Sequence, residues 1–217
     1  MLRPTSLVVT LLGITLLLSG CFLGPKGGGT LTYSGPTEQS IPMGGGIPGT
    51  DIRYMGYSDA GAEVLIADQR AVKKPGDSLD WQGTPVQGVD VALSQRVLTA
   101  NPQRLQTVGT VKVTVHDSAP QPAPFPAGPA YSYKVAVTYS VPKGKLIPGT
   151  QITYLGKTDQ GAQFGGVSGY PYRKLGDSVS WTGQLRSNAY LDTTLRVIAY
   201  ADSFVQVAGL AELGLTQ

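Results

Sequence analysis

Cysteine, histidine and charge are all scarce in this chain. Its 217 residues include one cysteine and one histidine, and 14% of them are charged. A single cysteine leaves no disulfide within the chain, and most zinc sites need three or four nitrogen or sulfur ligands. A Ser-His-Asp triad would depend on His116, which we expect at a solvated strand end beside a proline-rich segment. We therefore predict no enzyme activity, no metal site and no cofactor.

The few charges are also nearly balanced. There are 17 basic and 14 acidic side chains, which give a formal net charge of +3. They are scattered, apart from small groups such as Lys73-Lys74 and Arg173-Lys174. Nucleic-acid-binding proteins carry a clustered basic footprint, so we expect no nucleic-acid partner.

Glycine, proline and tyrosine are plentiful instead. The chain has 29 glycines and 16 prolines, and its 11 tyrosines outnumber its 4 phenylalanines. This composition favours short strands joined by turns over helical bundles. The predicted fold class is all-β.

An apolar run from Leu7 to Leu18 follows Arg3 and ends at Ser19-Gly20-Cys21. The run fits the ~7–15-residue core of a secretory signal and is shorter than the roughly 20 apolar residues that span a membrane. The tetrad Leu18-Ser19-Gly20-Cys21 resembles the signal of bacterial lipoprotein precursors, with the only cysteine at the position that is lipidated.

This resemblance covers about the first 21 residues. It implies that residues 1–20 are a signal peptide, cleaved between Gly20 and Cys21, and that Cys21 carries acyl chains such as palmitate. Two or three such chains hold a protein stably on a bilayer, so the partner would be a bacterial membrane on its extracytoplasmic side. Phe22 stands where Asp would favour retention at the inner membrane, so the outer membrane or cell surface is favoured. The alternative is an ordinary cleaved signal in which Cys21 is incidental.

The rest of the chain is duplicated with a spacing of 100 residues. Between residues 41–109 and 141–209, 22 of 69 aligned positions are identical. The tetrad Ile47-Pro48-Gly49-Thr50, for example, recurs as Ile147-Pro148-Gly149-Thr150. A repeat of this length indicates a domain duplication rather than a solenoid. The predicted parts are a flexible tether over 21–29, a first repeat over 30–115, a stiff proline-rich linker over 116–130 and a second repeat over 131–217.

Each repeat has the sequence pattern of a β-sandwich. From Tyr131 to Val141, apolar and polar residues alternate with a period of two, which is typical of a half-buried strand. Each repeat offers about six or seven short strands, and this number favours two tandem immunoglobulin-like antiparallel sandwiches; a small β-barrel is the alternative. Gly35 and Pro36 interrupt the corresponding strand of the first repeat, which we therefore expect to be short or broken.

The positions at which the repeats differ are the better functional candidates, because shared residues define the common scaffold. Where the first repeat has an ordinary strand sequence over 63–72, the second has Gln-Phe-Gly-Gly-Val-Ser-Gly-Tyr-Pro-Tyr over 163–172. Tyr170 and Tyr172 would be exposed and stiff, and suited to stacking on a sugar or gripping a protein. The alternative is a loop that packs on its own sheet.

Three further differences lie nearby in the second repeat and could add polar contacts to a ligand. Arg186, Asn188 and Tyr190 replace Val86, Gly88 and Asp90. By contrast, Trp81 and Trp181 fall on the apolar face of a strand in both repeats, so we interpret them as core residues rather than sugar platforms.

These features predict a lipid-anchored cell-envelope protein with two β-sandwich domains. Its function would be that of a protein-interaction or structural module, with a partner protein of the envelope. The alternative is a carbohydrate-binding lipoprotein that uses Tyr170 and Tyr172 to bind cell-wall or surface glycan. In a third interpretation, the first repeat is a stalk that presents the second.

Overall fold

The computed structural model describes residues 29–217. The predicted signal peptide, the cleavage site at Gly20 and Cys21 and residues 21–28 of the tether lie outside the described residues. The all-β prediction is confirmed, because residues 29–217 consist of strands, turns and loops, and every strand pairing is antiparallel. This part of the chain has no helix that could span a membrane.

Seven strands fall in the first repeat, seven in the second and one between them. The strands are β1 (Gly29–Pro42), β2 (Ile52–Ser58), β3 (Gly61–Ile66), β4 (Gln69–Lys73), β5 (Trp81–Val86), β6 (Val89–Asn101), β7 (Arg104–Ser118), β8 (Gln121–Pro122), β9 (Tyr131–Pro142), β10 (Thr153–Thr158), β11 (Gly161–Gly165), β12 (Tyr172–Arg173), β13 (Ser178–Arg186), β14 (Ala189–Ala201) and β15 (Phe204–Leu215).

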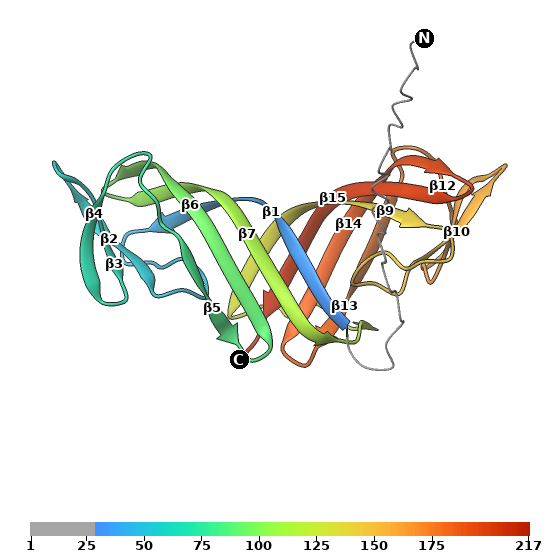
Figure 1. The fold of residues 1–217 in the computed structure, drawn as a ribbon, viewed down its shortest axis with the longest axis horizontal. Coiled ribbons are helices and arrows are strands. Elements are labelled where there is room, and N and C mark those ends of the chain that lie inside the picture. The colour runs from blue at the N-terminus through green and yellow to red at the C-terminus, as the bar shows by residue number, and fades with distance from the viewer. Residues whose placement is uncertain (1–28) are drawn as a thin grey trace, which may run out of the picture.

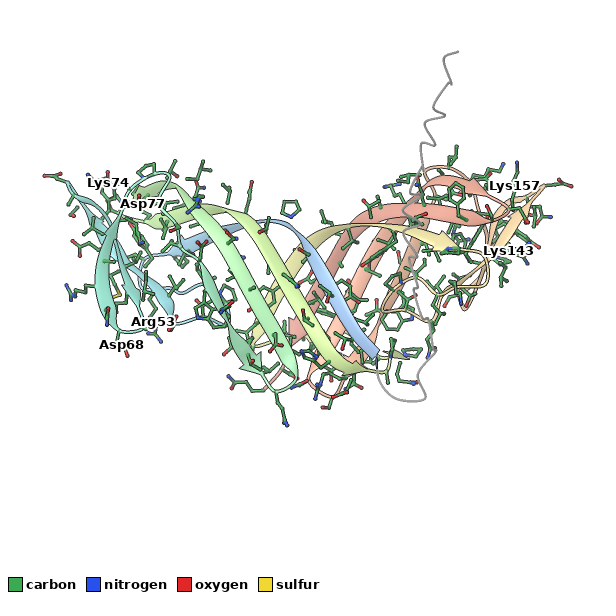
Figure 2. The ribbon with its side chains drawn as sticks, in the orientation of Figure 1. Arg53, Asp68, Lys74, Asp77, Lys143 and Lys157 are labelled. Carbon is green, nitrogen blue, oxygen red and sulfur yellow. The ribbon has the colours of Figure 1, made fainter. Side chains whose placement is uncertain are left out.

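Each repeat forms one large sheet and one small sheet. The large sheets have the orders β1-β7-β6-β5 and β8-β13-β14-β15-β9, and the small ones are β2-β3-β4 and β10-β11-β12. Figure 1 shows the large sheets meeting in the middle of an elongated molecule, with the small sheets at its two ends. Charged side chains mark these ends, Lys74 and Asp77 on one and Lys143 and Lys157 on the other (Figure 2).

The two repeats also share their irregularities. A register shift lies between Tyr54 and Gly56 in β2, and another lies between Tyr154 and Gly156 in β10. Strands β6 and β14 contain a second matching pair of shifts. Bulges increase the local twist of a strand, so the duplicated sequence also duplicates the curvature of its sheets.

The first strand is long and continuous, so the expectation that it is broken was wrong. β1 spans 14 residues, and Pro36 stands in register opposite Thr110 of β7. The strand lies at the edge of its sheet, where a residue without an N–H is tolerated. Gly35 is required because β1 meets β9 there: a Cβ at this position would lie 2.6 Å from the carbonyl oxygen of Ala136.

The proline-rich segment lies along the second repeat. β7 extends to Ser118, and β8 then pairs with the outer edge of β13. Further along, the ring of Phe125 lies over Gly214, where a Cβ would come within 2.7 Å of it. The amide of Gln151 adds a hydrogen bond of 3.0 Å to the carbonyl of Pro120.

The buried apolar side chains of both repeats form one cluster. Within it, each repeat inserts a tyrosine into the Ile-Pro-Gly-Thr turn of the other. The Tyr133 hydroxyl donates to the Pro48 carbonyl at 2.7 Å, and the Tyr33 hydroxyl would lie 1.9 Å from a Cβ at Gly149. The repeats are therefore interlocked reciprocally, in the way that two copies related by a two-fold axis would be.

Candidate functional site

Tyr170 and Tyr172 lie together where β11 and β12 are joined. Their ring centroids are 5.3 Å apart and the ring planes meet at 63°, an edge-to-face arrangement. Tyr170 is 63% exposed and Tyr172 is half-buried. An edge-to-face pair fixes both rings more firmly than either alone, and it leaves most of Tyr170 open to a ligand.

Arg173 holds this tyrosine pair in place. Its Nη1 donates to the carbonyls of Tyr170 and Tyr172, the latter at 3.0 Å, and its Nε donates to the carbonyl of Ser178 at 2.8 Å. The hydroxyl of Tyr170 donates to Oε1 of Gln160 at 3.3 Å. One guanidinium therefore ties the loop to the start of β13, so the loop is pre-ordered before any ligand arrives.

A shallow hollow of about 470 Å³ opens beside the tyrosines. Its lining adds polar and charged groups to the rings, from Gln160, Arg173, Lys174, Asp177 and Ser178. Asp177 is already engaged, since its carboxylate accepts a 2.7 Å hydrogen bond from the N–H of Lys174. The site offers an aromatic surface with hydrogen-bonding groups at its side, which suits a polar ligand that has one flat face.

The first repeat has no such pair at the equivalent place. There β3 and β4 form a continuous hairpin, whose turn has Ala67 and Asp68 at positive φ. Val72, rather than a tyrosine, occupies the position of Tyr172. The tyrosine site belongs to the second repeat alone, as the comparison of the two sequences predicts.

Arg186 and Asn188 lie elsewhere, between the repeats. Nη1 of Arg186 donates to the carbonyls of Gly88 at 3.2 Å and His116 at 3.0 Å, and the amide of Asn188 donates to the Gln87 carbonyl at 3.0 Å. The tyrosine loop lies beside Ser178, where β13 begins, and Arg186 lies at the other end of β13. The eight residue steps between them span roughly 26 Å along the strand. The structure therefore does not bring these two residues to the tyrosines.

Gly88 of the first repeat leaves the space that the Arg186 side chain occupies. A Cβ at Gly88 would lie 1.6 Å from its Nη1, so this guanidinium fits only where the first repeat has glycine. Tyr190 is separate again: it lies on β14, where its hydroxyl meets the amide of Gln184 at 3.5 Å. Of the five ligand candidates, only Tyr170 and Tyr172 belong to the tyrosine site.

Arg173 is the site residue that comparison of the repeats does not single out. Its counterpart is Lys73, so the two positions look alike as basic residues. The sequence signal that could have identified this residue is the change from lysine to arginine. A guanidinium has a fork of five donors that can hold several carbonyls at once, which an ammonium cannot do in the same geometry.

The tryptophans differ in burial. Trp181 is 7% exposed within the core, whereas Trp81 is only half-buried and packs against it. Each indole lies over the glycine two residues further on, Gly183 and Gly83 respectively. Neither ring belongs to the tyrosine site.

His116 faces Asp90 rather than a nucleophile. Its Nε2 lies 2.7 Å from Oδ2 of Asp90, and the Thr84 hydroxyl donates to Oδ1 of Asp90 at 2.7 Å. These bonds, first that from Thr84 and then that with His116, hold the pKa of the Asp90 carboxyl below its usual value. Because the carboxylate lies between hydroxyl and imidazole, the hydroxyl bonds to the carboxylate and not to the imidazole, unlike in a catalytic triad.

Residues 29–217 contain no group of three or more His, Cys, Asp or Glu side chains placed to hold a metal ion. No family model, curated protein or solved structure matches this chain. Its function is therefore inferred from its own residues.

Proposed function

We propose that this chain is a lipid-anchored protein of the bacterial cell envelope that acts as a protein-interaction module, without catalytic activity. In this proposal residues 1–20 are removed as a signal peptide, Cys21 carries the lipid, and the folded part works on the extracytoplasmic side, at the outer membrane or cell surface. The observation that carries the interaction role is the exposed pair Tyr170 and Tyr172, held by Arg173.

The chemistry of this site is suited to gripping a protein. Tyrosine and arginine are enriched among the residues that contribute most to protein interfaces. A tyrosine has only two side-chain torsions to fix, so it supplies contact area at low entropic cost. Because Arg173 already orders the loop through three carbonyls, little further ordering is needed on binding, and less of the contact energy is lost.

A glycan is the second candidate ligand. The hollow beside the tyrosines is lined by amide, hydroxyl, ammonium and carboxylate groups, which can bond the hydroxyls of a sugar while Tyr170 stacks on its apolar face. The lipid anchor would then serve to hold the protein near cell-wall or surface glycan.

We further infer that the repeats are tandem sandwiches of the immunoglobulin-like kind predicted from the number of strands. Support comes from the seven strands and two antiparallel sheets in each repeat. In this proposal the interlocked repeats form a firm support, which holds the tyrosine site at one end of the molecule.

The proposal is tested by capture on isolated cell envelopes, before and after exhaustive protease treatment of the envelopes. A soluble chain of residues 22–217 is compared with the double variant Tyr170→Ala, Tyr172→Ala. Tyr57→Ala is the matched control, because Tyr57 is a 50% exposed tyrosine at the other end of the molecule.

We expect the double variant to lose capture and Tyr57→Ala to retain it. Capture that protease treatment abolishes supports a protein partner, whereas capture that survives supports a glycan. Equal capture by the double variant and the unaltered chain would exclude the tyrosine site from either role.

A further inference from the structure

The large sheet of the first repeat has an open edge that is covered in the second repeat. β5 ends the order β1-β7-β6-β5, and no strand of residues 29–217 pairs with its outer side. Its counterpart β13 is covered by β8, with Gly183 opposite Pro122 and Gln184 opposite Gln121. In the second repeat, the equivalent edge thus accepts a short extended segment that contains proline.

Residues of β13, whose edge β8 covers, are more buried than their counterparts on β5, whose edge is open within residues 29–217. Three positions on β13 are buried while their counterparts on β5 are half-buried, namely Trp181, Gly183 and Leu185 against Trp81, Gly83 and Pro85. Across the sheet, Gly214 is buried under Phe125, whereas its counterpart Thr114 is half-buried. The half-exposed indole of Trp81 is thus an apolar anchor beside an unpaired strand.

The backbone of β5 keeps the groups that this pairing uses. The carbonyl of Leu185 accepts a 2.8 Å hydrogen bond from the N–H of Ala119, and Pro85 at the same position retains its carbonyl. Thr84 and Pro85 have no partner on β6, because the register passes from Gly83 directly to Val86. Pro85 lacks an N–H, which disfavours indiscriminate pairing with other exposed edges.

A hollow of about 450 Å³ adjoins this edge. It is lined by Gln82, Gly83, Thr84, Asp90, Lys112 and Thr114, among others. In the second repeat the proline-rich segment runs over the equivalent surface, from Gly183 of β13 to Gly214 of β15. Among residues 29–217, the hollow is therefore the unfilled counterpart of a groove that the second repeat fills with extended chain.

We propose that the outer edge of β5, with Trp81 and the adjoining hollow, binds an extended, proline-containing segment of a partner protein as an added strand. Main-chain hydrogen bonds would supply the affinity, as in other cases of strand addition. Thr84 and Pro85 take the places of Gln184 and Leu185, and Trp81 covers the incoming strand. This site is distinct from Tyr170 and Tyr172 and does not depend on their role.

The first test adds, at the end of the chain itself, a segment that could pair with the outer edge of β5. Because the tyrosine insertions of the two repeats are reciprocal, we expect the end of β15 to lie relative to β5 as the end of β7 lies relative to β13. We would append the sequence of residues 118–129 after Gln217 of the full chain and follow hydrogen exchange of the Thr84 amide. We expect exchange to slow by at least about tenfold, the factor that corresponds to one net main-chain hydrogen bond.

The control is the same extended chain with Thr84→Pro, which removes the only N–H at positions 84 and 85. Its residues 81–86 should stay as fast to exchange as in the chain without the extension. No protection in the extended chain would overturn the proposal. Slow exchange in the unaltered chain would also overturn the proposal. If the Thr84 amide there exchanged as slowly as the Gln184 amide, the edge would already be occupied by this chain or a second copy.

The second test supplies the strand from outside. A synthetic peptide with the sequence of residues 117–128 is titrated to about 1 mM, the effective concentration of a short tether, into the full chain. We expect saturable shifts of the Thr84 and Trp81 resonances, and at least about tenfold weaker binding to Thr84→Pro. The double variant Tyr170→Ala, Tyr172→Ala should bind the peptide normally. Absence of binding to the unaltered chain would overturn the proposal, whatever the outcome at the tyrosine site.

Discussion

The hydroxyl of Tyr133 donates a 2.7 Å hydrogen bond to the carbonyl of Pro48, 85 residues away in the other repeat. The reciprocal tyrosine, Tyr33, enters the turn at Gly149, but its buried hydroxyl has no hydrogen-bond partner within residues 29–217. The two insertions match in place and differ in chemistry, so single changes can separate the contribution of packing from that of the hydrogen bond.

We expect Tyr133→Phe to lower the free energy of unfolding by about 1–3 kcal/mol, because it leaves the Pro48 carbonyl without its partner. Tyr33→Phe should leave the free energy of unfolding unchanged or raise it slightly, since no bond is lost and a buried polar atom is removed. Urea denaturation of both variants measures the difference. Equal losses would contradict the asymmetry.

Gly149→Ala should be far more damaging than Gly144→Ala. The two glycines have almost the same φ, +76° and +77°, so the backbone strain of a side chain is matched. At Gly144 a Cβ meets nothing within 4 Å, whereas at Gly149 it would lie 1.9 Å from the Tyr33 hydroxyl. We expect the additional loss at Gly149 to be about 1–3 kcal/mol, the usual cost of overpacking. Guanidinium unfolding midpoints check it, and equal midpoints would show that Tyr33 can move aside.

Arg186→Ala should lower stability without affecting ligand capture. Its guanidinium bridges two carbonyls of the first repeat, and hydrogen bonds from charged groups contribute about 1.5–3 kcal/mol. Asn188→Ala removes one neutral bond and should cost about 1 kcal/mol. Thermal unfolding and envelope capture of the same proteins test both points. A loss of capture with unchanged stability would instead assign Arg186 to a ligand.

Arg173→Ala should release the tyrosine loop. Three hydrogen bonds to carbonyls are lost, two of them exposed and one partly buried. Because all three lie within or beside the loop, we expect faster proteolysis between residues 165 and 172 with little change in global stability. Capture should weaken because the tyrosines must be ordered on binding. Limited proteolysis and capture assays, with Lys73→Ala at the equivalent place as the control, measure these effects.

Stability should fall above pH 10 through three tyrosines, of which Tyr33 and Tyr133 are buried and Tyr139 is half-buried with a buried hydroxyl. Burial raises the pKa of Tyr33 and Tyr133 above the usual value, and it raises the pKa of Tyr139 to about 12. Above pH 10 these hydroxyls ionise in the unfolded chain but stay protonated in the fold. The stabilisation is therefore complete below pH 10 and is lost as the pH rises towards the folded pKa, by about 1.4 kcal/mol per pH unit for each such group. Tyr139→Phe should reduce the slope of stability against pH between 10 and 12, and an unchanged slope would contradict its part in it.

The strands themselves could be predicted from the sequence, because alternation of apolar and polar residues reports directly on which side of a strand is buried. The alternation from Tyr131 onwards appears as β9, with the buried and exposed positions of Val135, Ala136 and Val137 as expected. Tyr170 and Tyr172 could also be selected as candidates from the sequence, because positions that differ between two copies of one fold can serve a function that only one copy has. What alternation does not report is the partner of each strand.

That limit explains the residues whose places could not be predicted. Pro36 looks like a strand breaker until its place on an edge strand is known. Arg186 looks like a ligand contact until the turn at Gly88 is seen beside it. In both cases the deciding neighbour is far away in the sequence, so no local pattern reveals it.

The reciprocal tyrosines also bear on how this chain assembles. In each repeat, the tyrosine that enters the Ile-Pro-Gly-Thr turn comes from the other repeat. A protein with one such repeat could receive this tyrosine only from a second copy of itself, so that contact would depend on concentration. The covalent link between the copies makes that encounter intramolecular. A single molecule of this chain can thus make both tyrosine insertions without a second copy.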